Sequence, residues 1–208
     1  MISNVRKRAK KAPMEKLLLV NEKDEVLGEE TKGKCHREDG ILHRAFSVYI
    51  FNSKGELLIQ QRSKFKKLWP FFWTNSCCSH PRKGENYEAA GERRLKEELG
   101  FTASLRNFGK FQYAARYKDI GAERELVTLL VGRYDGKIKP DQREVADFKW
   151  VDINDLKRNM AKYPQGYTPW LEKGLKIIFK KRLCPVVKIR YLPTSSGEKG
   201  CREYKNNW

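Results

Sequence analysis

Residues 74–81, TNSCCSHP, place two adjacent cysteines and a histidine between the aromatic run WPFFW and a long charged run. Thiols and imidazoles bind metals and carry nucleophilic or acid–base chemistry, and thiols also pair as disulfides. From the residues alone, the stretch can be a disulfide framework, a metal clip, a buried thiol pair or a catalytic thiol beside a metal. The chain has five cysteines, an odd number without regular spacing, which disfavours the disulfide framework.

The charged run orders its carboxylates and arginines as E-x7-R-x-L-x-E-E-x-G-F over residues 85–101. Arg93 and Glu97, and likewise Arg94 and Glu98, are four residues apart, so exposed ion pairs along a solvated helix explain the run by themselves. Carboxylates that converge on one edge of a helix also supply oxygen ligands for Mg²⁺, which in turn holds a diphosphate. The residues alone leave both interpretations open.

These groups need a scaffold, and the hydrophobic pattern predicts strands mixed with helices. Runs of β-branched and aromatic residues bounded by turn formers predict strands, and the two runs about the turn NSKGE predict a hairpin. The predicted strands are two within residues 16–28, then 43–51, 57–63, 108–117, 125–134 and 147–152. Residues 29–43 lack periodicity and are expected to form a loop.

Three helices are expected between and after these strands. An apolar residue every four positions, closed by Gly100, predicts a helix at residues 86–99 with one face in the core. Two further helices are expected at residues 154–163 and 168–181. Because strands and helices mix without a regular alternation, the pattern indicates an α+β fold or a mixed α/β sandwich.

Length and charge bound the class of protein. With 208 residues the chain can form one sizeable core, and we expect one domain. The net charge of +18 is typical of nucleic-acid binding, but much of it lies in residues 1–12 and 180–208, and no groove-reading motif is present. We therefore expect no nucleic-acid partner, since an anionic small substrate uses the charge equally well. No apolar run approaches the ~20 residues of a transmembrane helix, and the basic start lacks a secretory signal's apolar segment, so a reducing cytoplasm is expected.

Residues 79–101 resemble the Nudix box, a loop, helix and loop motif that binds a divalent metal and a diphosphate. Ser79 replaces the opening glycine, and Arg94 replaces a glutamate that is a principal metal ligand in Nudix hydrolases. Together with TNSCCSHP, WPFFWTN upstream and YTPW downstream, this departure makes the chain similar to the type I isopentenyl-diphosphate isomerase family, a side branch of the Nudix fold. The resemblance covers residues 15–180.

The resemblance implies an α+β fold in which a Nudix-type mixed β-sheet is sandwiched between helices. It places a basic extension at residues 1–13, the isomerase domain at residues 14–180 and a basic tail at residues 181–208. The implied reaction interconverts isopentenyl diphosphate and dimethylallyl diphosphate, which are small prenyl substrates, through a tertiary carbocation. Two alternatives stay open: a Nudix hydrolase of a nucleoside or prenyl diphosphate, and a non-catalytic module that binds RNA or acidic membranes.

Two metal sites also follow from the resemblance. All three histidines fall where this family has metal-binding histidines, although a lone histidine is more often a surface or hydrogen-bonded residue. Two strand carboxylates join them, and their spacing of two points both to the same side. The implied ligands of the first ion, which is Mn²⁺, Zn²⁺ or Mg²⁺, are His36, His43, His80, Glu123 and Glu125. The second ion, Mg²⁺, is expected to bridge the diphosphate to Glu98.

The family match gives the cysteine pair a role: Cys78 is the implied catalytic thiol and Cys77 is its neighbour. Glu125, with Tyr113 beside it, is expected to act on the opposite face of the substrate, and Trp170 to stabilise the carbocation through its ring. An inert buried thiol at Cys78 and a core role for Trp170 are the plainer alternatives. The residues matched to the diphosphate are Lys32, Arg62, Lys66 and Arg94.

Overall fold

The computed structural model describes residues 14–180. The predicted basic segments at residues 1–13 and 181–208 lie outside the described residues, so the domain boundaries stay a prediction. Within the described range, no helix combines the length and the apolar composition that crossing a bilayer requires. The location expected from the sequence also stays a prediction.

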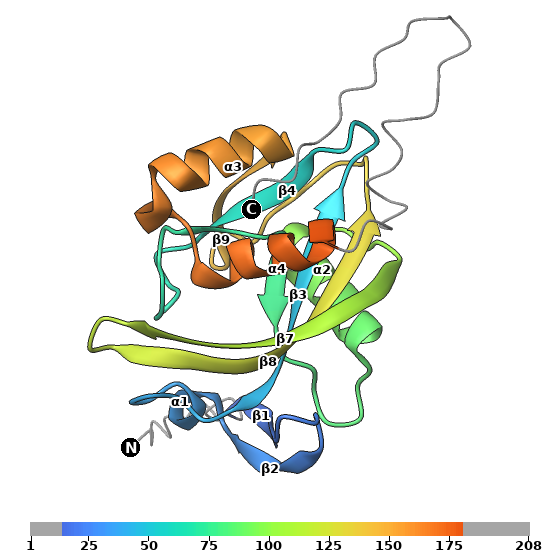
Figure 1. The fold of residues 1–208 in the computed structure, drawn as a ribbon. Coiled ribbons are helices and arrows are strands. Elements are labelled where there is room, and N and C mark those ends of the chain that lie inside the picture. Colours follow the sequence, from blue (N-terminus) through green and yellow to red (C-terminus); the bar gives the residue numbers. More distant parts are fainter. Residues whose placement is uncertain (1–13, 181–208) are drawn as a thin grey trace, which may run out of the picture.

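Nine strands form one mixed sheet around β3 (Figure 1). The strands are β1 (Lys16–Val20), β2 (Val26–Thr31), β3 (His43–Phe51), β4 (Leu57–Arg62), β5 (Trp73–Thr74), β6 (Cys77–Ser79), β7 (Leu105–Tyr117), β8 (Gly121–Arg133) and β9 (Val145–Val151). β3 pairs in parallel with β8 over its whole length, whereas its pairings with β1, β4 and β6 are antiparallel. Because a strand has only two hydrogen-bonding edges, β6 and β8 lie on opposite edges of β3.

Helices cover both faces of this sheet. They are α1 (Lys32–Cys35), α2 (Tyr87–Leu99), α3 (Ile153–Lys162) and α4 (Pro169–Lys180), with a 3₁₀ turn at Pro164–Gly166. Successive side chains of β3 point to opposite faces. Val48 therefore packs in the cluster that contains Leu95 of α2, and Tyr49 packs in the cluster that contains Leu156 of α3 and Leu171 of α4. The predicted α+β fold, with a mixed sheet between helices, is confirmed.

The helix that carries the charged run has clear signals at both ends. Asn86 accepts a hydrogen bond from a backbone N–H of the first turn, and Gly100, with a φ of 76°, ends the helix in the left-handed conformation that glycine adopts readily. Leu95 and Leu99 are fully buried against the sheet. The predicted helix is confirmed, and its buried face fixes its rotation, which turns Arg94 toward the cavity described below.

The predicted hairpin of β3 and β4 is correct only at its turn. The two strands share a single pair, Phe51 opposite Leu57. Beyond it, β4 pairs with β9, and β3 pairs with β8 and β6. The physical reason is burial: β3 is buried on both faces from Ala45 to Phe51, so it occupies the centre of the sheet, where partners from distant parts of the chain compete for its edges.

The predicted loop at residues 29–43 is also partly wrong. β2 continues through Thr31, and α1 follows directly at Lys32–Cys35. α1 is a single turn, too short for any hydrophobic period, so no pattern in the sequence signals it. The short strands β5 and β6 were likewise not expected, because they are two and three residues long and contain polar and thiol side chains.

Candidate active site

A cavity of about 390 Å³ opens among α1, α2, α4, the strands β6, β7 and β8, and the segment that follows β4. Eleven of the side chains named from the sequence line it: Lys32, His36, Arg62, Lys66, Cys78, His80, Arg94, Tyr113, Glu123, Glu125 and Trp170. The other two, His43 and Glu98, are buried, and each contacts a residue that does line the cavity. The fold therefore brings the predicted site residues together.

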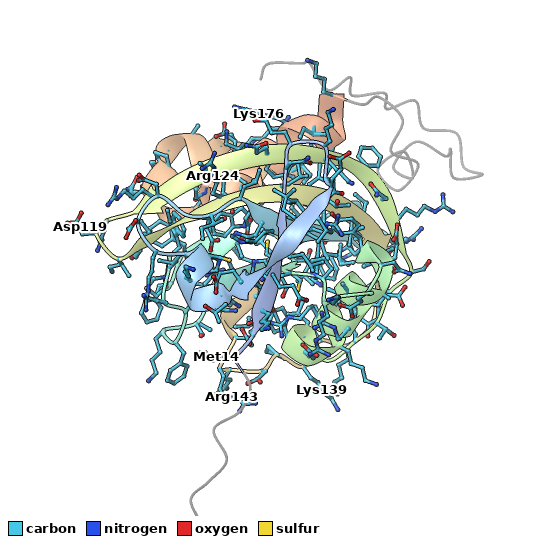
Figure 2. All side chains as sticks on the ribbon, turned by 90° about the horizontal axis from the view of Figure 1, so that it is seen from below. Met14, Asp119, Arg124, Lys139, Arg143 and Lys176 are labelled. Atoms are coloured by element: carbon cyan, nitrogen blue, oxygen red, sulfur yellow. The ribbon has the colours of Figure 1, made fainter. Side chains whose placement is uncertain are left out.

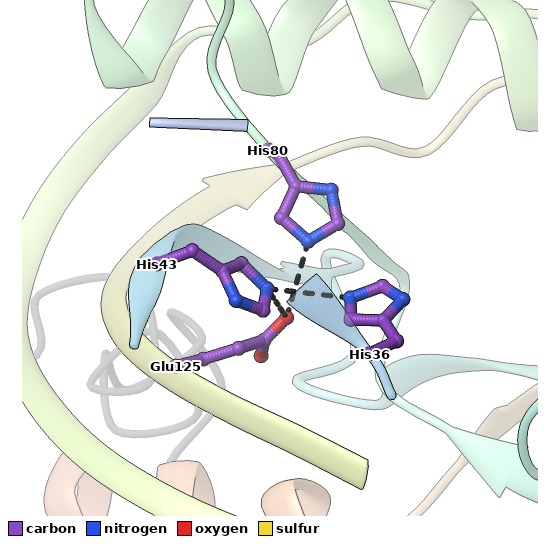
Figure 3. A group of neighbouring side chains, drawn as sticks. All are labelled: His36, His43, His80 and Glu125. Atoms are coloured by element: carbon purple, nitrogen blue, oxygen red, sulfur yellow. Dashed lines mark hydrogen bonds and ion pairs between the residues drawn. The ribbon is translucent and has the colours of Figure 1, made fainter. Parts of the chain in front are cut away.

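Three imidazoles and one carboxylate converge on the cavity wall, and we call them the histidine cluster: His36, His43, His80 and Glu125 (Figure 3). His36 follows α1, His43 begins β3 and His80 follows β6, so the rings arrive from three separate elements. One ligand atom from each of the four residues lies within 4.8 Å of the others. Such a grouping of nitrogen and oxygen ligands suits a divalent metal ion.

The polar contacts of His43 and Glu123 indicate whether the histidine cluster is suited to binding a cation. His43 Nδ1 lies 2.7 Å from the carbonyl oxygen of Ile41. Since that oxygen can only accept, Nδ1 carries a proton, and Nε2 of the neutral ring offers a lone pair toward the cluster. Glu123 Oε2 is 3.0 Å from His36 Nε2, yet it is buried and has no hydrogen bond. An inward lone pair and an unsatisfied buried carboxylate oxygen both fit a cation, so the cluster and Glu123 can hold a divalent ion.

Glu125 connects the histidine cluster to the cavity. Its Oε1 lies 3.3 Å from His80 Nε2 and 3.6 Å from His43 Nε2, and its Oε2 accepts the Tyr113 hydroxyl at 2.7 Å. Burial by itself raises the pKa of Glu125, but His43 and His80, when protonated, hold this pKa well below its usual value. Burial, followed by the charge of Glu125, raises the pKa of Tyr113 well above its usual value. The carboxylate is therefore ionised and accepts a hydrogen bond from a neutral phenol.

Cys78 reaches the cavity from the opposite edge of β3, where it pairs with Ser47 in the ladder between β3 and β6. Its Sγ lies 3.3 Å from Ser47 Oγ and 3.1 Å from Asn75 Oδ1. Burial raises the pKa of the Cys78 thiol to about 11, so the thiol is protonated at neutral pH. Cys77 points instead into the core beneath α2, and both are free thiols. The two adjacent cysteines thus have different surroundings.

Aromatic rings close the apolar end of the cavity. Trp170 is 3 % exposed and lines the wall, and its ring centroid lies 5.8 Å from that of Tyr113. Trp69 packs edge-on against Trp170 with the centroids 5.2 Å apart. The guanidinium of Arg62 lies 5.5 Å from the centroid of the Trp170 ring, a distance at which the ring quadrupole attracts a cation. Trp170 is therefore both a core residue and a cavity residue.

The other end of the cavity is basic. Arg94 donates to Glu98 and Glu97 and lies 3.4 Å from Glu144, and Lys66 forms an ion pair with the same Glu144. Burial by itself lowers the pKa of Arg94, but Glu98 and Glu144 raise it, so the guanidinium stays charged. Positive groups gathered at one end of a cavity suit a diphosphate, and arginine contributes planar, bidentate contacts.

Glu98 lies beneath the wall of this basic end. Its side chain is 1 % exposed, one oxygen accepts from Arg94, and the other accepts from Gln60 Nε2 at 3.0 Å. The structure thus brings Glu98 next to Arg94 without placing it at the cavity surface. The role expected for Glu98, a bridge from Mg²⁺ to the diphosphate, stays a prediction.

Four polar residues around the cavity were not identified from the sequence: Glu15, Ser47, Asn75 and Glu144. Met14, where the described chain begins, and Arg143 lie at the same edge of the molecule (Figure 2), and their neighbours Glu15 and Glu144 line one hollow there. Glu15 lies 2.9 Å from Lys32 Nζ and 3.7 Å from His80 Nδ1. No spacing links these residues to their partners, although Asn75 belongs to the stretch TNSCCSHP and its amide offered a signal.

Comparisons with known proteins show the family to which the chain belongs. A family model of the NUDIX domain matches residues 41–171. The Isopentenyl-diphosphate Delta-isomerase of Nocardia farcinica is 42% identical over 160 residues, which cover 76% of this chain and 91% of that protein. The protein of the same name from Burkholderia multivorans is 43% identical and covers 75% of this chain and 88% of that protein. The chain belongs to the isopentenyl-diphosphate Delta-isomerase family.

The isomerase family shares its fold with other NUDIX-domain proteins of known structure. A Deinococcus radiodurans protein superposes with a TM-score of 0.63 at 25% identity, covering 78% of this chain and 99% of that one. Lys32 and His36 precede the range that the NUDIX family model matches. This isomerase therefore completes its cavity with residues that come before the matched NUDIX range.

Proposed function

We propose that the chain interconverts isopentenyl diphosphate and dimethylallyl diphosphate. One observation carries the proposal: a neutral thiol, Cys78, and an ionised carboxylate, Glu125, line the same cavity from strands on opposite edges of β3. Moving a double bond requires a proton to be added at one carbon and another to be removed at a second carbon. An unactivated alkene is a poor base, so both groups must be held in place.

The residues at the apolar end protect the intermediate. Protonation of the alkene produces a tertiary carbocation, which water would capture. Trp170, Leu68 and Tyr113 line this end of the cavity and are nearly fully buried, so they exclude water there. The face of Trp170 is expected to stabilise the cation by ~2 kcal/mol or more, because the site is desolvated. Glu125, with its hydrogen-bonded partner Tyr113, then holds or removes a proton on one face and Cys78 does so on the other.

Metal ions complete the proposal. The histidine cluster and Glu123 would hold one divalent ion, and the ligand preferences of Mn²⁺, Zn²⁺ and Mg²⁺ all suit these residues. When bound, this ion supplies positive charge that keeps Glu125 ionised and fixes its position. Glu98, which pairs with Arg94, would supply a carboxylate ligand to a second ion, Mg²⁺, and that ion would add positive charge for the diphosphate. Lys32, Arg62, Lys66 and Arg94 bind the diphosphate.

Substituting Arg94 with glutamate is expected to raise KM for isopentenyl diphosphate about 10- to 100-fold, because a charge-assisted contact to phosphate becomes a repulsion. Arg94→Lys keeps the charge, so its KM should lie between those of Arg94→Glu and the wild type. Arg106→Glu, on an exposed position of β7, makes the same change of charge away from the cavity and serves as the control. KM and turnover are measured by steady-state kinetics, after circular dichroism has shown that each variant is folded. Unchanged KM and turnover in Arg94→Glu would contradict the proposed role.

The reaction itself is tested in one tube. The purified chain is incubated with isopentenyl diphosphate and Mg²⁺, Mn²⁺ or Zn²⁺, the alkene protons are followed by NMR, and released phosphate is assayed in parallel. We expect dimethylallyl diphosphate to appear without phosphate release. Phosphate release with an unmoved double bond would instead identify a Nudix hydrolase. Neither signal, with metals supplied, would indicate a non-catalytic module.

A further inference from the structure

Two polar side chains of the stretch TNSCCSHP lie behind the cavity wall, between Trp170 and Cys78. We propose that Thr74 and Asn75 are positioning residues, which fix the orientations of the Trp170 ring and the Cys78 thiol through one continuous chain of hydrogen bonds. The inference rests on the proposed function, since it assigns these residues a part in that reaction. Neither residue is among those that line the cavity, so both act through the residues that do.

The direction of each hydrogen bond follows from the chemistry of Asn75. Its Nδ2 lies 3.0 Å from the carbonyl oxygen of Val48 and 2.8 Å from that of Cys77, and carbonyl oxygens only accept, so the amide orientation is fixed. Oδ1 must then accept on its other side. It lies 3.1 Å from both Cys78 Sγ and Thr74 Oγ1, so both of these groups donate to it.

Thr74 continues the chain toward the aromatic end of the cavity. Its single hydroxyl proton is given to Asn75, so its oxygen accepts from every other neighbour. Those neighbours are Trp170 Nε1 and Thr168 Oγ1, each at 2.9 Å. The chain therefore runs from the indole N–H of Trp170 through Thr74 and Asn75 to the thiol of Cys78.

Burial makes this arrangement rigid. Thr74 is 1 % exposed and Asn75 is 0 % exposed, so water does not replace a lost partner. Thr74 is also held by the sheet, where it pairs with Gln60 of β4. The chain thus ties α4, which carries Trp170, to the segment that carries Cys78. Since misplacement by about 1 Å can cost a hundredfold in rate, such a tie has a direct consequence for the reaction.

The test replaces Thr74 with valine, which has the same shape but no hydroxyl. We expect kcat for isomerisation to fall about 10- to 100-fold while KM stays within about twofold, because Lys66 and Arg94, two of the proposed diphosphate contacts, lie at the basic end of the cavity. Thr74→Ser restores the hydroxyl and should recover kcat to within about threefold. Thr128→Val, at a fully buried threonine of β8 outside the chain of hydrogen bonds, is the matched control and should behave as wild type.

A second readout needs no activity. In ¹⁵N–¹H spectra the indole N–H of Trp170, assigned with Trp170→Phe, should shift and exchange faster in Thr74→Val but not in Thr128→Val. If Thr74→Val does not fold, Thr74→Ala replaces it in both measurements. An active wild type in which Thr74→Val keeps full kcat, or an unmoved Trp170 signal in that variant, overturns the positioning role alone. A folded, metal-supplied wild type without isomerisation overturns the proposed function instead.

Discussion

Replacing Cys78 with alanine is expected to lower kcat for isomerisation about 1,000-fold, within the range that a well-placed acid or base contributes. The thiol lines the cavity, and burial raises its pKa to about 11, so at neutral pH it carries a proton that it can donate. KM should change little, because the diphosphate is bound by the basic end of the cavity. The measurement is steady-state kinetics by NMR with isopentenyl diphosphate and saturating metal.

Cys77 provides a matched control for this prediction. It is the neighbouring residue and is completely buried, but it packs in the core that includes Leu95 and Leu99 of α2. Cys77→Ala should therefore lower the free energy of unfolding by about 1 kcal/mol while kcat per folded molecule stays close to wild type. The assignment of the thiol is wrong if Cys77→Ala loses turnover and Cys78→Ala keeps it.

Replacing Glu125 with glutamine is expected to lower kcat at least 1,000-fold and to reduce the divalent metal that the purified protein retains. The substitution keeps the size of the side chain and removes its charge. One carboxylate oxygen of Glu125 faces His43 and His80, and the other accepts a hydrogen bond from the Tyr113 hydroxyl. The substitution therefore affects both metal binding and proton transfer. Metal content is measured by elemental analysis alongside the kinetics.

Adding excess metal separates the two roles of Glu125. If the carboxylate also carries a proton, metal content should recover at high metal concentration while turnover does not. Glu172→Gln is the control, since Glu172 is a half-exposed residue of α4 whose carboxylate pairs with Lys176 away from the cavity. Full recovery of turnover together with metal would show that Glu125 is only a ligand. Retained metal and activity in the absence of added ion would contradict both roles.

The sequence by itself determined the features that depend on near neighbours. The helix of the charged run was readable because its apolar repeat and its closing Gly100 both act within a few residues. Strand alternation likewise predicted that Glu123 and Glu125 point to the same side of β8, and both line the cavity. The site residues themselves came from the family resemblance, whose short motifs occur in a fixed order.

Only the tertiary structure decided which distant residues meet. β3 takes β8 as its long partner although β4 follows it directly, and that choice sets His43 opposite Glu125. The three histidines arrive from three separate elements, and no local period records their convergence. Thr74 meets Trp170 across 96 positions of the chain. Such contacts depend on the pairing of strands and the burial of whole faces, which are properties of the complete fold, so no short stretch of sequence contains them.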